Sequence, residues 1–166
     1  MPTLTLCADD FAFSSDTSRV IADLLAARRL TATGCMTVRP NWREDSRMLR
    51  DVPADRAIGL HLVLTDEVPL TAMPRLAPGG ELPHLHRLER LSGSTLPLDE
   101  LAAEIDAQFD AFAQAMGRPP AFVDGHQHAH ALPAIREVVL AAVRRHAPAA
   151  WLRTCEERLG AVLARP

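Results

Sequence analysis

Three histidines within five residues are the clearest group of chemically capable side chains in this sequence: His126, His128 and His130, in the stretch His-Gln-His-Ala-His. Packing alone gives little reason for such a group. Imidazole is the commonest side-chain ligand for metal ions, and spacings of two or four residues can direct two rings to one point. Asp124 could orient one ring by accepting its second N–H, or it could cap the following turn. The stretch therefore predicts metal binding or acid–base catalysis.

Two adjacent carboxylates, Asp9 and Asp10, and a single histidine, His61, are the other candidates. Neighbouring side chains at the end of an extended strand point to opposite faces, so one carboxylate can bind a metal while the other accepts a proton from water. Taken alone, the aspartates are more typical of a loop or helix cap, and His61 of a buried core. Together, two carboxylates and several imidazoles without thiolates suit a divalent ion with a position open to water.

The elements that must position these residues alternate between strands and helices. Short apolar runs predict strands at residues 3–8, 33–38, 57–63, 121–124 and 151–154. Apolar residues at helical spacing predict a helix that begins at Ser14 or Ser15, a helix over 99–116 with Gly117 as its C-terminal cap, and a helix that begins at Pro133. A weaker pattern predicts a short helix over 42–49. This order predicts an α/β fold with a parallel sheet, in which the polar groups meet beyond the carboxyl ends of the strands.

Residues 66–98 interrupt this alternation, because they contain five prolines and the pair Gly79-Gly80. A long irregular stretch in a compact domain predicts a lid, a binding loop or a mobile segment. The whole chain, residues 1–166, is long enough for one domain with a sizeable core.

Composition excludes several classes of protein. A net charge of −3 without a basic cluster argues against nucleic-acid binding. The sequence has neither a basic leader nor a run approaching the ~20 apolar residues of a membrane span, so we expect a cytoplasmic protein without a membrane partner. Cys7, Cys35 and Cys155 are odd in number and include no Cys-x-x-Cys pair, which argues against a disulfide framework or a thiolate zinc site. The sequence lacks a Gly-x-Ser-x-Gly motif and a glycine-rich phosphate loop.

Five motifs, in their order and spacing, resemble those of the YdjC-like carbohydrate deacetylases, particularly the chito-oligosaccharide deacetylase type. They are Ala-Asp-Asp-Phe at 8–11, Ala-Ile-Gly-Leu-His-Leu-Val-Leu-Thr at 57–65, Pro-Leu-Thr-Ala-Met-Pro at 69–74, Gly-Arg-Pro-Pro at 117–120, and Asp-Gly-His-Gln-His-Ala-His at 124–130 followed by Pro133. The resemblance extends from the N-terminus to about residue 154.

The resemblance implies a distorted, TIM-like β/α barrel and a divalent metal, magnesium first and zinc as the alternative. It assigns Asp10, His61 and His126 as metal ligands and Asp9 as the catalytic base. The implied reaction removes an acetyl group from a small oligosaccharide substrate that contains N-acetylglucosamine, such as chitobiose, in free or phosphorylated form.

The sequence departs from the family pattern at two places. The family usually has Gly where Ala12 stands, and a positive φ there would strain alanine. A full barrel needs about 200–250 residues, so we expect an incomplete barrel of about five β/α units whose open edge favours a homodimer. A late family histidine that acts as general acid has no counterpart here, which leaves His128 or His130 to protonate the leaving amine.

Two other functions remain open at this point. A metal-dependent phosphoesterase could use the same ligands, because they position water for attack on phosphorus as well as on carbon. A non-catalytic sugar- or metal-binding protein is the second alternative, and it predicts binding without turnover.

Overall fold

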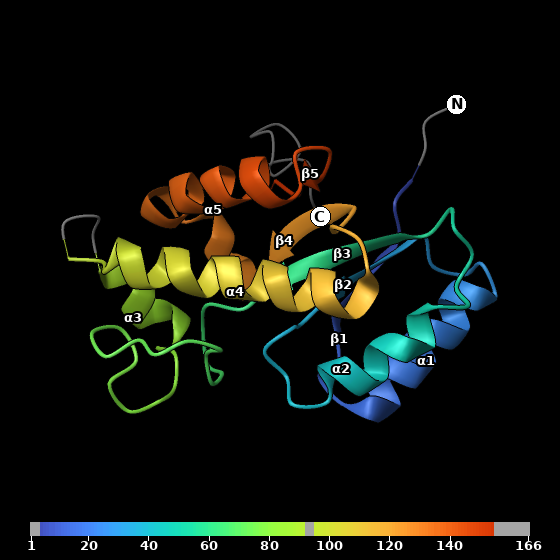
Figure 1. Cartoon of the computed structure of the whole chain (residues 1–166), viewed down its shortest axis with the longest axis horizontal. Helices are drawn as coiled ribbons and strands as arrows, with labels where there is room; N and C mark the ends of the chain where they lie inside the picture. Colours follow the sequence, from blue (N-terminus) through green and yellow to red (C-terminus); the bar gives the residue numbers. More distant parts are fainter. Residues whose placement is uncertain (1–3, 92–94, 155–166) are drawn as a thin grey trace, which may run out of the picture.

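The computed structural model describes residues 4–91 and 95–154, which form one parallel sheet with helices along it (Figure 1). The strands are β1 Cys7–Phe11, β2 Ala32–Cys35, β3 Ala57–Leu62, β4 Phe122–Gly125 and β5 Trp151–Leu152. The α-helices are α1 Ser15–Ala26, α2 Trp42–Asp45, α3 Leu85–Arg90, α4 Leu98–Met116 and α5 Pro133–His146, and two 3₁₀ segments are η1 Ser46–Leu49 and η2 His126–Ala131.

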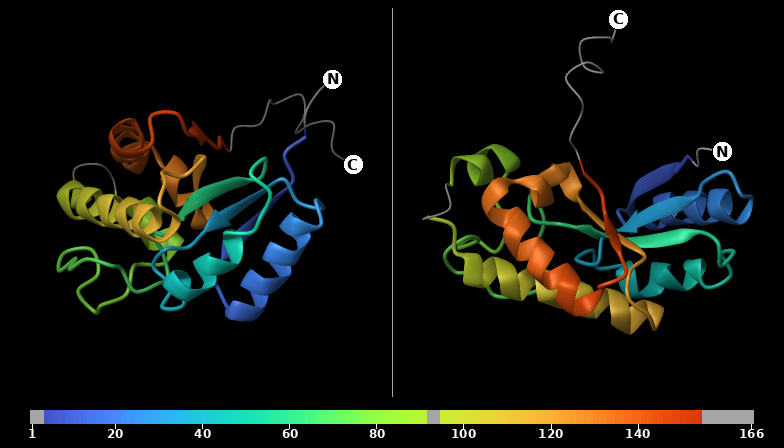
Figure 2. Two further views of the ribbon diagram at one scale, coloured as in Figure 1. Left: turned by 45° about the vertical axis from the view of Figure 1, so that its right-hand side comes forward. Right: turned by 90° about the horizontal axis from the view of Figure 1, so that it is seen from above.

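The strand order in the sheet, β1-β2-β3-β4-β5, is the order of the strands along the chain, and every neighbouring pair is parallel. A doubly wound sheet would reverse direction at a switch point. Without that reversal, crossovers of one hand leave the helices on one side of the sheet. Figure 2 shows the helices following one another around the sheet in sequence order, from α1 in blue to α5 in red. The fold is therefore an incomplete β/α barrel, and the predicted fold class is confirmed.

The two faces of the sheet have different compositions. On the helix side, Ile58, Leu60 and Leu62 of β3 are all buried in the hydrophobic core. The opposite face lines the barrel interior, where Gly59 lies beside Phe122 of β4. The Phe122 ring stacks on Trp151 of β5 with centroids 4.4 Å apart. Since Gly59 has no side chain, it leaves the space that this aromatic pair fills.

Several element boundaries differ from the sequence-based expectations. β1 begins at Cys7 and continues to Phe11, whereas the apolar run had predicted a strand over 3–8. The strand continues through its two aspartates because their carboxylates find polar partners in the barrel interior. The prediction for α4 is confirmed, with Gly117 at φ 67 as its left-handed cap.

The stretch 66–98 is less irregular than its prolines suggest. It contains α3, which was not predicted, and Leu88 of this short helix is buried. A helix of under two turns has little amphipathic pattern of its own and depends on burying such a residue.

Buried polar side chains of α4 hold the start of this stretch. The Glu104 carboxylate accepts hydrogen bonds from the backbone N–H groups of Leu70 (3.1 Å) and Thr71 (2.8 Å), and from Gln108 Nε2. Gln108 in turn bonds both backbone groups of Val63, at 3.0 and 2.7 Å. These bonds replace the ladder partners that an irregular backbone lacks, so the segment after β3 is anchored to α4.

Two further expectations bear on membranes and cysteines. Among the described residues, no helix is long and apolar enough to cross a membrane. Cys7 and Cys35 are free thiols, and Cys155 lies outside the described residues.

We predict that Gly59→Ala destabilises the fold. The added Cβ would lie 2.5 Å from the Phe122 ring, which its stacking partner Trp151 prevents from moving freely. Overpacking of this kind lowers the free energy of unfolding by about 1–3 kcal/mol, measurable by urea unfolding. Gly79→Ala is the matched control, because no heavy atom lies within 4 Å of its added Cβ. Equal stability of the two variants would contradict this packing argument.

We also predict that Glu104→Ala loosens the segment after β3. Two backbone N–H groups lose their buried acceptor, and hydrogen bonds to charged groups contribute about 1.5–3 kcal/mol each. Limited proteolysis should cut residues 66–76 faster in this variant than in the wild type. Glu89→Ala, at an exposed position, should leave the cleavage rate unchanged.

Candidate metal centre

A bulge in β1 positions the two adjacent aspartates. The pairing of β1 with β2 is irregular between Ala8 and Phe11, and Asp10 has φ 62. In a regular strand Asp9 and Asp10 would face opposite sides of the sheet, as we expected from the sequence. The bulge and the left-handed residue turn Asp10 instead, so that both carboxylates reach the surroundings of one imidazole.

Asp10, near the carboxyl end of β1, His61, near the carboxyl end of β3, and His126, directly after β4, form a compact cluster. Asp10 Oδ1 lies 3.2 Å from His61 Nε2 and 3.1 Å from His126 Nδ1. The His61 side chain is 4% exposed, while those of His126 and Asp10 are 21% and 41% exposed. The cluster is therefore buried on one side and open to solvent on the other.

His61 is oriented through its second ring nitrogen. The buried Asp124 carboxylate accepts a hydrogen bond from His61 Nδ1 at 2.7 Å. The sequence left two roles open for Asp124, orienting a histidine ring or capping the following turn, and the ring that it orients comes from β3. With Nδ1 donating to Asp124, His61 Nε2 is left facing the Asp10 carboxylate.

An unprotonated His61 Nε2 and the Asp10 carboxylate are both hydrogen-bond acceptors, and at 3.2 Å they need a positive charge between them. Burial opposes protonation of His61, but the hydrogen bonds to Asp10 and Asp124 outweigh it and raise the pKa of His61 to about 9. Hydrogen bonds from His126 and His61 hold the pKa of Asp10 well below its usual range. In the absence of a metal ion, a proton on His61 supplies this charge.

The same three side chains suit a divalent cation. Ligand atoms bonded at about 2.0–2.2 Å and roughly at right angles lie about 3 Å apart, close to the separations found between Asp10 Oδ1 and the two ring nitrogens. Asp124 supplies the hydrogen bond that metal-binding histidines ordinarily donate with their other nitrogen. The structure thus brings together the three residues that the resemblance had assigned as ligands.

Arg153, directly after β5, is a site residue that sequence reasoning missed. Its Nη1 lies 2.8 Å from Asp9 Oδ2 and 2.8 Å from Asp124 Oδ2. Cys7 Sγ also contacts Asp9, at 3.4 Å from Oδ1. A signal was available, since Arg153 lies near the carboxyl end of the strand predicted over residues 151–154, at the same edge of the sheet as the other polar groups.

The remaining histidines of the stretch are placed differently. His130 is 1% exposed, and its Nε2 donates to the backbone carbonyl of Arg153 at 3.0 Å. Burial lowers the pKa of His130, so this ring is neutral and ties the end of β5 to η2. His128 is exposed, at φ 59 in a left-handed turn that begins at Gln127. The Gln127 amide donates to Asp66 Oδ2 at 2.9 Å, which joins the turn to the segment after β3.

The sequence profile of the YdjC-like protein family matches residues 3–165. The chain belongs to the YdjC-like family.

Named relatives and a solved structure agree with this assignment. The chain is 34% identical over 136 residues to a chitooligosaccharide deacetylase of Enterobacter sp. (strain 638), covering 82% of this chain and 53% of that protein. It is 35% identical over 142 residues to one of Yersinia pestis (strain Pestoides F), covering 85% and 55%. A crystal structure of a protein from Enterococcus faecalis V583 superposes with a TM-score of 0.77 at 25% identity, covering 94% of this chain and 60% of that one. The chain thus spans about half the length of the curated relatives it matches.

The residue that departs from the YdjC-like pattern, Ala12, does lie in a strained conformation. Its φ is 75, in the region that favours glycine. The Ala12 N–H donates to Ser18 Oγ at 3.0 Å, and Ser18 Oγ donates to the buried Asp45 carboxylate at 2.7 Å. These hydrogen bonds hold the turn that follows Asp10 in spite of the strain that the Ala12 methyl group causes at this φ.

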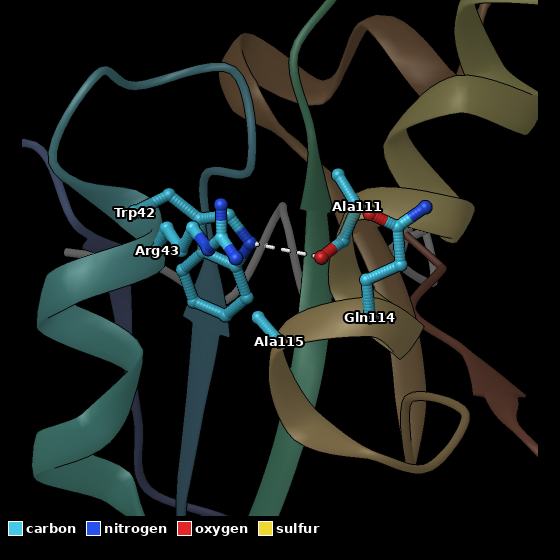
Figure 3. A pocket seen from close by; sticks show the side chains of 5 residues that line it. All are labelled: Trp42, Arg43, Ala111, Gln114 and Ala115. Carbon is cyan, nitrogen blue, oxygen red and sulfur yellow. Dashed lines mark hydrogen bonds between the residues drawn. The ribbon is translucent and has the colours of Figure 1, made fainter.

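A pocket between α2 and α4 lies apart from the YdjC-like site. It is lined by Trp42, Arg43, Ala111, Gln114 and Ala115, and the Trp42 indole N–H donates to the Ala111 carbonyl at 3.1 Å (Figure 3). It lies between helices outside the sheet, and none of its residues belongs to the polar cluster.

We predict a pH-dependent stability for the EDTA-treated protein. Because the folded-state pKa of His61 is raised to about 9, the contribution of this ring is fully present below its ordinary pKa of about 6.5 and is lost as the pH rises through about 9. The free energy of unfolding should therefore fall by something on the order of 1–3 kcal/mol between pH 6.5 and 9.5. His61→Gln should flatten this slope, whereas the exposed His86→Gln should retain it. Parallel slopes for all three proteins would contradict the assignment.

Proposed function

We propose that this chain is a carbohydrate deacetylase that removes the acetyl group from N-acetylglucosamine-containing oligosaccharides with a divalent metal ion. The observation that carries the proposal is the half-open cluster of Asp10, His61 and His126 with the Asp9 carboxylate beside it. The named deacetylase relatives support the same reaction class. We infer a small chitobiose-like oligosaccharide as the substrate and the cytoplasm as the compartment.

Asp10, His61 and His126 would hold the metal. Once bound, a divalent ion lowers the pKa of water and polarises the amide carbonyl. Two imidazoles suit zinc, whereas a carboxylate and open water positions suit magnesium. We propose magnesium as the resident ion and retain zinc as the alternative that the assay below resolves.

The proton transfers are assigned to other residues. Asp9 accepts a proton from the attacking water, and the hydrogen bond from Arg153 to its Oδ2 fixes the direction of the carboxylate. The leaving amine must be protonated. We assign this step to His128, which is exposed, since the buried His130 uses its N–H on a backbone carbonyl.

Acetate release from di-N-acetylchitobiose should test the activity. The purified chain should release acetate, lose this activity in EDTA, and regain it with Mg²⁺ or Zn²⁺, and the ion that restores more activity is the preferred metal. Phosphate release from a sugar phosphate without acetate release would indicate a phosphoesterase instead. Saturable sugar binding without either product would indicate a binding protein.

Two substitutions should separate metal binding from proton transfer. His126→Ala removes a ligand and should abolish both metal binding and acetate release. Asp9→Asn should keep the metal, because Asp9 lies outside the cluster of three, and should lower kcat by about 10²–10⁴. His86→Gln, at an exposed position, serves as the control for both. Metal retained in full by His126→Ala would refute the ligand assignment.

A further inference from the structure

His61 belongs to two groups of potential metal ligands. Its Nε2 faces Asp10 in the cluster described above, and its Nδ1 faces Asp124. Asp9, His61 and Asp124 also bring three ligand atoms within 4.8 Å of one another. By donor chemistry alone, this second group, two carboxylates and an imidazole, is as suitable for a divalent ion as the first.

The Arg153 guanidinium already pairs with both carboxylates of the second group. Arg153 Nη1 lies 2.8 Å from Asp9 Oδ2 and 2.8 Å from Asp124 Oδ2. Two carboxylates this close, one of them with a side chain 0% exposed, need a cation to offset their desolvation and mutual repulsion. Arg153 is thus the cation of the second group, and its own position is secured by backbone bonds to Val123 and His130.

The two groups also differ in access to water. Asp10 in the first group has a side chain 41% exposed, which leaves room for water and substrate. In the second group, the Asp124 side chain is fully buried and that of His61 is 4% exposed. An ion in the second group would therefore lie away from the substrate side and would take Asp9 as a ligand, so that this carboxylate could not accept a proton.

We propose that Arg153 is a positioning residue that excludes divalent ions from the group formed by Asp9, His61 and Asp124, and so confines the metal to Asp10, His61 and His126. The proposal rests on the metal site of the proposed function. It assigns Arg153 a selective role in addition to its contribution to stability: it determines which side of His61 carries the ion.

The test uses Mn²⁺ as the probe, with free Mn²⁺ measured by electron paramagnetic resonance. His126→Ala disables the first group and should bind almost no Mn²⁺. Adding Arg153→Gln to that variant should restore binding of about one ion per chain, because the second group loses its resident cation. The matched control is His126→Ala with Arg153→Lys, which keeps a positive charge and should remain free of Mn²⁺.

A third substitution locates the regained ion. Asp9→Asn, added to the His126→Ala/Arg153→Gln variant, removes a ligand of the second group only and should abolish the regained binding. Failure of the double variant to bind Mn²⁺ would overturn the proposal. So would equal binding with Lys and Gln at position 153. A purely structural role for Arg153 predicts that Mn²⁺ binding is lost, and never gained, with either Gln or Lys at position 153.

Folding of the double variant is monitored by circular dichroism with and without Mn²⁺. If the unpaired carboxylates unfold it, the proposal expects Mn²⁺ to restore the fold and raise Tm, since a ligand that binds only the native state stabilises it. A chain that remains unfolded in Mn²⁺ would overturn the proposal. The wild type separates the two hypotheses: absence of Mn²⁺ binding there refutes the proposed function, whereas the comparison of Gln with Lys decides the role of Arg153.

Discussion

The His61 imidazole, buried between two carboxylates, is the interaction on which the rest of the site depends. A ring has only two nitrogens, so the bond from Nδ1 to Asp124 determines where Nε2 points. The surrounding structure accommodates this ring closely. A Cβ on Gly34 of β2 would lie 3.2 Å from both His61 and Asp124, so glycine at this position leaves room for the pair. The register of β3 and β4 sets His61 opposite Asp124.

Charge balance then explains why the end of β5 belongs to the site. Asp9, Asp10 and Asp124 gather around one imidazole, and Arg153 is the guanidinium that contacts two of them. In a flat sheet, four spacings of ~4.8 Å would separate β1 from β5 by roughly 19 Å. The Arg153–Asp9 contact is possible because the sheet is curved and because arginine is long. The curvature of the incomplete barrel thus brings the Arg153 guanidinium close enough to balance the charge of Asp9.

The loops around the site are held by polar side chains rather than by regular structure. Ser18 accepts a hydrogen bond from the turn after Asp10, and Glu104 on α4 accepts hydrogen bonds from the segment after β3. Left-handed residues occur at Asp10, Ala12 and Gln127, all near the cluster. Such conformations cost free energy and persist where surrounding contacts determine them. Their concentration here is typical of a functional site.

The sequence by itself determined the order of strands and helices, the parallel sheet, and the candidate residues at its edge. Apolar periodicity and residue chemistry are local properties, and they suffice for these conclusions. Only the tertiary structure decided which of the candidate residues contact one another. Asp10 lies beside His61 and His126 because of the bulge in β1. Asp9 and Asp124 both contact Arg153 because the sheet is curved. The buried His130 holds the backbone at the end of β5. These pairings join residues up to 144 positions apart. They depend on strand register and sheet curvature, which arise from packing and are not encoded by local pattern.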